Sequence, residues 1–267
     1  MTDPKAEDLL RRAYALSGED PAETKALYRD WAETYDGTMM DGLAYVSPIK
    51  IAALLAKHQP DRDMRVLDVG CGVGTAGLCL VRRVPNVKMA GVELQPELQA
   101  LATLNAEKNG LSSRAHFARG DIRAKGGLLA ARSFDHVFSN PPYIAGSKGR
   151  SSDSRRADIS KRETEADLAE WIDAMLYWVK ERGHITIIHR ADRLHEIIEL
   201  LSPRVGALRV CPVWPKRGRN ANRVIVQGRR EAKAGMTLSP GIVVRHHDDT
   251  VTREMEEIQR HGLGLSL

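Results

Sequence analysis

Four consecutive residues, Asn140-Pro141-Pro142-Tyr143, carry groups that could hold an amino group in place. The Asn140 side-chain oxygen can accept a hydrogen bond, and the two prolines aim their carbonyls rigidly because proline fixes φ. Tyr143 offers a flat face on which a planar base or amide can stack. Asparagine and proline also favour turns, so the tetrapeptide alone indicates an ordinary strand-to-loop turn. Its interpretation depends on the residues that precede it.

The tetrapeptide directly follows an apolar run, residues 134–139, which predicts a buried strand. Open α/β sheets place their ligands at the carboxyl ends of such strands. Three earlier runs, 65–69, 88–93 and 114–119, predict further strands, and each ends in a polar residue or a glycine. Because parallel strands end at one edge of a sheet, we expect these residues to converge with Asn140.

A glycine-rich loop, Gly70-Cys71-Gly72-Val73-Gly74, separates the first strand from a predicted helix over 78–83. Strand, glycine loop and helix form the usual nucleotide-binding arrangement. The loop and the residues after it also match the G-x-G-x-x-G pattern of dinucleotide sites, and Glu93 lies about twenty residues on. Asp68 argues against a dinucleotide, because a carboxylate repels a pyrophosphate. It would instead attract a cationic ligand such as S-adenosylmethionine, which carries an ammonium and a sulfonium.

This stretch resembles the cofactor loop of class I methyltransferases. The resemblance implies that the glycines let the backbone approach the methionine part of S-adenosylmethionine, and that Asp68 favours its cationic end. Glu93 would then bind the ribose hydroxyls. Asp121 would meet the adenine amino group, although it could equally cap the next helix. The implied cofactor-binding residues are Asp68, Gly70, Gly72, Gly74, Glu93, Asp121 and Asn140.

With Asn140, Pro141, Pro142 and Tyr143 as catalytic residues, the set resembles amino-methyltransferases that modify adenine, or occasionally cytosine or a glutamine amide. Residues 64–267 resemble bacterial tRNA adenine-N6 methyltransferases, which act beside the anticodon of valine tRNA. The stretches that carry this resemblance are 188–194, 212–215, 221–227 and 238–241. The first sixty residues depart from that pattern, and 28–36 look like the opening segment of small-molecule methyltransferases.

Two basic segments flank the predicted site. The first, 144–163, is long enough to order on a phosphate backbone, and the second is a loop that follows Trp214. Either could also be an ordinary solvated loop. The candidate RNA-binding residues are Lys148, Arg150, Arg155, Arg156, Lys216, Arg217 and Arg219.

The chain has 267 residues, a net charge of +5 and a pI near 9.1. Residues 1–60 are acidic, so the basic character belongs to the remainder. Three cysteines without metal-ligand spacing predict a reducing cytosol and no metal, and the absence of a membrane-length apolar run predicts a soluble, cytoplasmic protein. We also expect a monomer. We expect a Rossmann-like, mostly parallel seven-stranded sheet over 64–230, a helical cover over 1–63 and a packed tail over 231–267.

The sequence thus predicts S-adenosylmethionine-dependent methylation of an adenine amine in RNA, most specifically tRNA near the anticodon. A protein glutamine-amide methyltransferase and a small-molecule methyltransferase remain as alternatives. A nonenzymatic RNA-binding module would keep the basic loops but would need neither Asp68 nor Glu93, and an oxidoreductase would bind NAD instead.

Overall fold

The computed structural model describes residues 63–142 and 166–260, all of which fall within one compact unit. The predicted helical cover, Tyr143 and the candidate RNA-binding residues Lys148, Arg150, Arg155 and Arg156 lie outside the described residues.

The first half alternates strands and helices, as the apolar runs predict. The strands β1, β2 and β4 are short apolar runs whose residues are mostly buried, as expected inside a parallel sheet, whereas β3 at the sheet edge is only partly buried. Helix α5 begins with a proline in its first turn, and Gly110 follows its end with a φ of 67°. The elements are β1 (Met64–Val69), α4 (Thr75–Arg83), β2 (Val87–Glu93), α5 (Pro96–Lys108), β3 (Ala115–Arg119) and β4 (Phe134–Ser139).

The second half completes the sheet and adds a short tail. Helix α7 begins with a capping box, in which Asp167 and Glu170 each accept a hydrogen bond from the other's backbone N–H. The elements are α7 (Leu168–Trp178), β5 (Val179–Arg190), η2 (Ala191–Arg193), α8 (Leu194–Leu201), β6 (Val205–Trp214), β7 (Arg223–Arg230), β8 (Thr237–Leu238), β9 (Ile242–Val243) and α9 (Arg253–Arg260).

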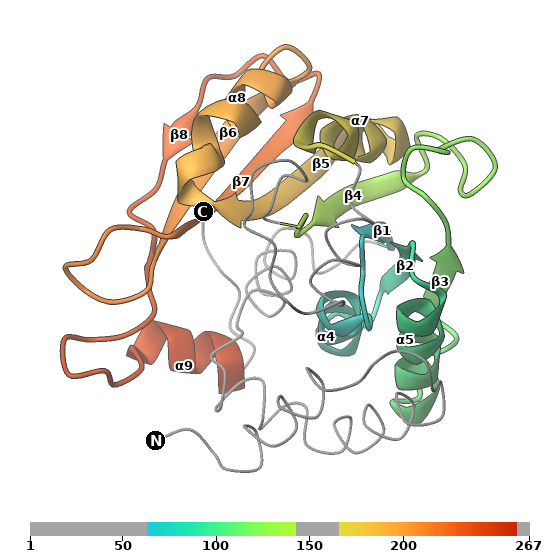
Figure 1. Cartoon of the computed structure of the whole chain (residues 1–267), viewed down its shortest axis with the longest axis horizontal. Coiled ribbons are helices and arrows are strands. Elements are labelled where there is room, and N and C mark those ends of the chain that lie inside the picture. Colours follow the sequence, from blue (N-terminus) through green and yellow to red (C-terminus); the bar gives the residue numbers. More distant parts are fainter. Residues whose placement is uncertain (1–62, 143–165, 261–267) are drawn as a thin grey trace, which may run out of the picture. The chain divides into compact units, whose positions relative to one another are not determined.

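The strands form one sheet in the order β3-β2-β1-β4-β5-β7-β6-β8, with β9 also paired to β6 (Figure 1). Strands β1 to β5 are mutually parallel, and β7 runs antiparallel between β5 and β6. The predicted Rossmann-like, mostly parallel sheet is therefore confirmed. Seven long strands agree with the expected count, and the tail adds two strands of two residues that the sequence pattern did not predict.

Helices cover both faces of the sheet. The chain moves from β1 towards β3 through α4 and α5, and from β4 towards β6 through α7 and α8, so right-handed crossovers put the two pairs on opposite faces (Figure 1). The α7 face holds a large apolar cluster that includes Leu67, Val137, Ile172 and Ile185, all at most 1% exposed. This packing fixes the strand ends that carry the site.

The helix α7 is shorter than its sequence pattern predicts. Apolar residues at helical spacing over 164–182 predict a single amphipathic helix, but α7 ends at Trp178 and β5 begins at the next residue. Tertiary contacts override the helix-forming Lys-Glu-Arg sequence there: Lys180 Nζ bonds Asp135 Oδ1 at 3.0 Å, and Arg182 has a φ of 59°, outside the helical region.

Candidate active site

The carboxyl ends of the first four strands lie level with one another. In the sheet register Val69 stands opposite both Val92 and Ser139, and Glu93 stands opposite Arg119. The residues that follow these positions therefore share one edge of the sheet. The structure brings together Gly70, Glu93, Gly120 with Asp121, and Asn140, as the sequence predicted.

Hydrogen bonds lock these strand ends to each other. Gly70 donates its N–H to the Val92 carbonyl at 2.8 Å, and Gly120 donates to the Glu93 carbonyl at 2.9 Å. The fully buried Ser139 hydroxyl donates to the Val69 carbonyl at 2.7 Å. Ser139 thus fixes the end of β4 against the start of the glycine loop, a positioning role that the sequence reasoning missed although it directly precedes Asn140.

The three loop glycines are required for two different reasons. Gly70, Gly72 and Gly74 all have positive φ angles, of 71°, 54° and 83°. A Cβ on Gly70 would lie 2.5 Å from the Trp171 ring, and one on Gly74 would lie 2.8 Å from Phe117. Around Gly72, by contrast, no atom of the described residues, its two chain neighbours aside, lies within 4 Å of the Cβ position. Within that part of the chain, the backbone at Gly72 is open to close approach by a ligand.

Two buried carboxylates stand beside this loop. Glu93, 7% exposed, accepts hydrogen bonds from the backbone N–H of Gly72 at 2.8 Å and of Gln95 at 3.0 Å. Asp68, 3% exposed, accepts one from the Gly77 N–H, while its Oδ2 atom has no hydrogen-bond partner among the described residues. Burial raises the pKa of Asp68 to about 8, and the nearby Glu93 charge adds to that shift. A buried oxygen left without a partner is expected where a ligand supplies one.

The residues present fit S-adenosylmethionine better than a dinucleotide. Gly77 lies on α4, where a Cβ would meet Met89 at 2.2 Å, so it allows close helix–strand packing, which either kind of site requires. The discrimination depends on Asp68 and Glu93. Two carboxylates beside the open backbone at Gly72 would repel a pyrophosphate and attract a cationic ammonium or sulfonium.

The cysteine of the glycine loop is not activated as a nucleophile. The Cys71 thiol is buried, and burial together with the charges of Asp68 and Glu93 raises its pKa, which disfavours the nucleophilic thiolate. Among residues 63–142 and 166–260, no group of three or more His, Cys, Asp and Glu side chains could hold a metal ion. In the same part of the chain, no helix combines the length and apolarity needed to cross a membrane.

The structure contradicts one of the two roles that the sequence suggested for Asp121, the capping of a following helix. No helix follows it, because residues 122–133 form turns, so the predicted helix-capping role is wrong. Its carboxylate instead accepts hydrogen bonds from the Arg123 backbone N–H at 2.9 Å and from the Arg123 guanidinium at 2.5–3.0 Å. These hydrogen bonds hold the pKa of Asp121 below its ordinary value, so the group is ionised at neutral pH. Contact with an adenine amino group stays a prediction.

The tetrapeptide begins where β4 ends. Asn140 is half-buried, Pro141 is buried and Pro142 is exposed, whereas Tyr143 lies outside the described residues. Asn140 follows β4 directly, as Gly70 follows the neighbouring strand β1, so both lie at the same edge of the sheet. Surrounding residues shield part of the Asn140 surface from solvent. Whether these residues hold an acceptor amine stays a prediction.

Three of the predicted RNA-binding residues lie on the same edge. Strand β6 runs in the direction of β5, so the loop after Trp214, which carries Lys216, Arg217 and Arg219, emerges on the side where Asn140 lies. β6 is three strands from β4 in the sheet, a lateral separation of about 14 Å at the usual strand spacing. Trp214 is half-buried and donates its ring N–H to the Pro240 carbonyl at 3.2 Å, so it packs against the tail.

Comparisons with known proteins find methyltransferases among the relatives of this chain. The family model "Methyltransferase small domain" matches residues 50–156, which include the glycine loop, Glu93 and Asn140. A tRNA1(Val) (adenine(37)-N6)-methyltransferase from Actinobacillus pleuropneumoniae is 28% identical over 166 residues, or 61% of this chain and 67% of the relative. A release factor glutamine methyltransferase from Bacteroides thetaiotaomicron is 27% identical over 58% of this chain and 49% of its own length.

The chain thus carries a methyltransferase domain, and its relatives indicate the class I, S-adenosylmethionine-dependent kind.

Solved structures support the fold of the methyltransferase. A predicted O-methyltransferase from Agrobacterium tumefaciens superimposes with a TM-score of 0.67 at 21% identity, covering 82% of this chain and 97% of its own. The methyltransferase subunit of a type I restriction-modification system from Streptococcus thermophilus gives a TM-score of 0.53 at 19% identity, covering 70% of this chain and 44% of its own. At such identities the likeness defines the fold alone.

The position of Asn140 provides a first test of this geometry. We expect Ser139→Ala to lower kcat about tenfold while the affinity for S-adenosylmethionine stays the same, because small displacements of a positioning group are costly to the reaction. Ser133→Ala is the matched control: its buried hydroxyl donates to the Ala130 carbonyl at 2.7 Å, at the opposite end of β4. Equal kcat losses in the two variants, measured with labelled cofactor, would contradict a specific role for Ser139.

Proposed function

We propose that the methyltransferase transfers a methyl group to the exocyclic N6 amine of an adenine in RNA, most specifically in tRNA near the anticodon. The observation that carries this proposal is the placement of Asn140 at the strand edge that also holds Asp68, Glu93 and the basic loop after Trp214. The similarity to relatives named as tRNA1(Val) (adenine(37)-N6)-methyltransferases supports the same substrate. The alignment with the Porphyromonas gingivalis relative covers 60% of that protein.

The cofactor, when bound, supplies an electrophilic methyl group on a sulfonium. Asp68 and Glu93 would hold its cationic and ribose parts, with Gly70, Gly72 and Gly74 leaving the backbone free for contact. The protein's remaining task is to present the acceptor amine, whose lone pair is delocalised into the adenine ring. We propose that Asn140 Oδ1 and the Pro141 carbonyl accept its two N–H bonds and thereby turn the lone pair out of the ring plane.

Positioning would then supply most of the catalysis. We propose that Tyr143 stacks on the base and keeps its ring parallel to the plane defined by the two acceptors. No strongly basic side chain is required, because an amine that has gained a methyl group becomes a strong acid and loses its proton readily. The target base must leave its stack to reach Asn140, which an anticodon loop permits more easily than a duplex.

The cationic loop after Trp214 suits a nucleic-acid substrate. Lys216, Arg217 and Arg219 follow β6, a strand about three strand spacings from β4, and they would contact phosphates of nucleotides further along an RNA whose target base is held at the site. We extend the same proposal to Lys148, Arg150, Arg155 and Arg156, and to a helical cover formed by residues 1–63. A cytoplasmic location and a monomeric state complete the proposal.

Methyl transfer to tRNA tests the proposal directly. The full chain should transfer label from S-adenosylmethionine to total tRNA from cells that lack the modification, and nucleoside analysis should find the label in N6-methyladenosine. Label in another nucleoside, or none, would sink the proposed substrate.

A glutamine amide is the second candidate, because the chain also resembles a release factor glutamine methyltransferase. A primary amide offers the same two N–H donors to Asn140 and Pro141. Incubation with purified bacterial release factors, followed by mass spectrometry of their glutamine-containing peptides, distinguishes the two. Methylation of protein without methylation of tRNA would establish the second candidate in place of the first.

A further inference from the structure

A second turn packs against the basic loop, although the two are far apart in sequence. The Arg217 N–H donates to the Arg245 carbonyl at 2.9 Å, and Lys216 Nζ pairs with Asp249 Oδ2 at 2.8 Å. Val244 donates to the Trp214 carbonyl at 2.8 Å, and a Cβ on Gly218 would lie 3.1 Å from the His247 ring. The turn between β9 and α9 therefore lies beside the loop between β6 and β7, on the same edge as Asn140.

The combined surface is net cationic, because four basic side chains, Lys216, Arg217, Arg219 and Arg245, outnumber the two carboxylates of Asp248 and Asp249. Arg217 and Arg219 are exposed and have no ion-pair partner among the described residues. The Arg245 guanidinium bonds a neutral acceptor, the Asp249 carbonyl, at 2.6 Å. The hydrogen bond from Lys216 lowers the pKa of Asp249, so this side chain carries a full negative charge within the surface. We call this set the paired-turn surface: Lys216, Arg217, Arg219, Arg245, His246 and His247.

We propose that the paired-turn surface binds the phosphate backbone of the RNA substrate, with the 245–247 turn as a second contact beside the 216–219 loop. The inference rests on the proposed function and extends it from one loop to a surface built by two. A polyanion recognised through its backbone suits guanidinium groups held on fixed turns, and of these residues Arg217 and Arg219 are exposed and Arg245 is half-buried. The placement on the edge that carries Asn140 would keep bound RNA within reach of the site.

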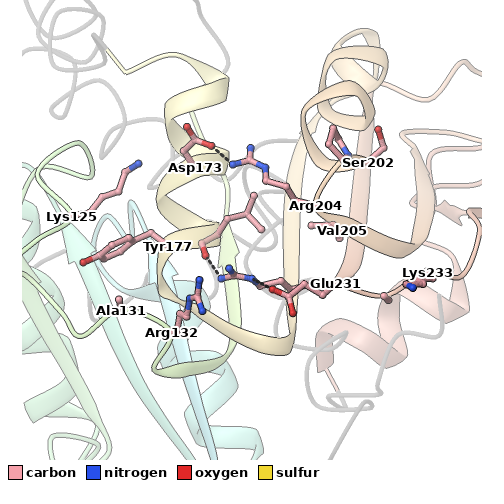
Figure 2. A pocket seen from close by; sticks show the side chains of 14 residues that line it. Lys125, Ala131, Arg132, Asp173, Tyr177, Ser202, Arg204, Val205, Glu231 and Lys233 are labelled. Carbon is pink, nitrogen blue, oxygen red and sulfur yellow. Dashed lines mark hydrogen bonds and ion pairs between the residues drawn. The ribbon is translucent and has the colours of Figure 1, made fainter.

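The opposite edge of the sheet offers a contrast. A pocket of about 810 Å³ lies near the starts of β4, β5 and β6, and it also has basic side chains in its lining (Figure 2). Its arginines are largely neutralised within the protein: Arg204 pairs with Asp173 at 2.6 Å, and Arg230 bonds the Leu176 and Val179 carbonyls and Glu231. Its exposed Lys233 provides a control for charge removal away from the paired-turn surface.

Isosteric charge changes test the proposal on the full chain. The affinity for the substrate tRNA, in its unmodified form, would be measured over a salt series for four variants: Arg217→Gln, Arg245→Gln, Asp249→Asn and Lys233→Gln. We expect the two arginine variants to bind several-fold more weakly and to lower the slope of log affinity against log salt by about 0.7 to 0.9, because each loses one phosphate contact. Glutamine can still donate to the Asp249 carbonyl. Asp249→Asn should bind several-fold more tightly, and Lys233→Gln should match the wild type.

The opposite signs separate an electrostatic surface from a structural one. Weaker binding by Asp249→Asn, wild-type binding by Arg245→Gln, or an equal loss in Lys233→Gln would overturn the proposal while tRNA methylation continued. Competition by polyglutamate at the same charge concentration as the tRNA would indicate an acidic protein partner, and would also overturn it. Failure of the wild type to methylate tRNA, with the expected binding pattern intact, would instead reject the proposed function alone.

Discussion

Asn140→Ala is expected to lose at least about 100-fold in turnover while keeping its affinity for S-adenosylmethionine. The substitution removes one of the two proposed acceptors for the amine N–H bonds, and removal of a single preorganised polar group in an active site typically costs 100- to 1,000-fold. The carboxylates that would hold the cofactor, Asp68 and Glu93, lie on β1 and β2 and are untouched by the change. Single-turnover methyl transfer and calorimetric titration with the cofactor measure the two quantities separately.

Asn140→Asp is the matched variant. Aspartate has the same shape and retains an acceptor oxygen at the Oδ1 position, so it should recover part of the turnover that alanine loses. Thermal unfolding of both variants would check that Asn140, which is half-buried, is not required for folding. If Asn140→Ala abolished cofactor binding together with turnover, the assigned role in presenting the acceptor amine would be wrong.

The sequence predicted the strands that form the site because each is a short apolar run that ends in an unusual residue. The β4 strand was predicted at its observed bounds, Phe134–Ser139, directly before Asn140. The convergence of Gly70, Glu93 and Asn140 then followed from the rule that parallel strands end at one edge. This part of the site depends only on local pattern and on the topology of a doubly wound sheet.

Contacts between distant segments could not be predicted in the same way. Helix α7 ends at Trp178 because Lys180 bonds Asp135, a partner 45 residues away. The turn after Asp121 closes on Arg123 rather than opening a helix, since a carboxylate held by a guanidinium two residues later stabilises the turn. Strands β8 and β9 have two residues each, too short for an alternating pattern to register.

The paired-turn surface is the clearest such case. The sequence indicated the basic residues at 216–219, but the turn at 245–249 lies about thirty residues further on. The pairing of β9 with β6 and the contacts of Lys216 and Arg217 bring that turn beside them. Likewise, the role of Ser139 depends on its hydrogen bond to the Val69 carbonyl on another strand. The role of Trp171 depends on its close packing against Gly70 in the glycine loop. The residue types alone therefore predicted the chemistry of the site, whereas the contacts that position its residues could be identified only in the tertiary structure.

Asp68→Asn is expected to weaken S-adenosylmethionine binding and to remove a pH dependence. Burial raises the pKa of Asp68 from its ordinary value of 3.8 to about 8 in the folded protein. A cationic group placed beside its unpartnered Oδ2 would favour the ionised form, so binding near neutral pH should release a proton. Wild-type affinity should rise with pH up to about 8, by at most about tenfold per unit from this group. The cofactor's own amine also titrates near that range, and the difference between wild type and variant isolates the contribution of Asp68.

The same shift makes a prediction for the protein without cofactor. Because the folded state binds this proton more tightly than the unfolded chain, Asp68 stabilises the fold fully below pH 4, and that stability is lost as the pH rises through about 8. The loss is on the order of 1 kcal/mol per pH unit across this window, and Asp68→Asn should lack that component. Urea unfolding at pH 5, 6, 7 and 8 measures the stability, and titration of the cofactor in two buffers of different ionisation enthalpy counts the released protons. Equal proton release by wild type and variant would exclude Asp68 from the cofactor site. If Asp68→Asn instead loses both the pH-dependent stability and the proton release, the buried carboxylate of Asp68 is the group that binds the cation of the cofactor.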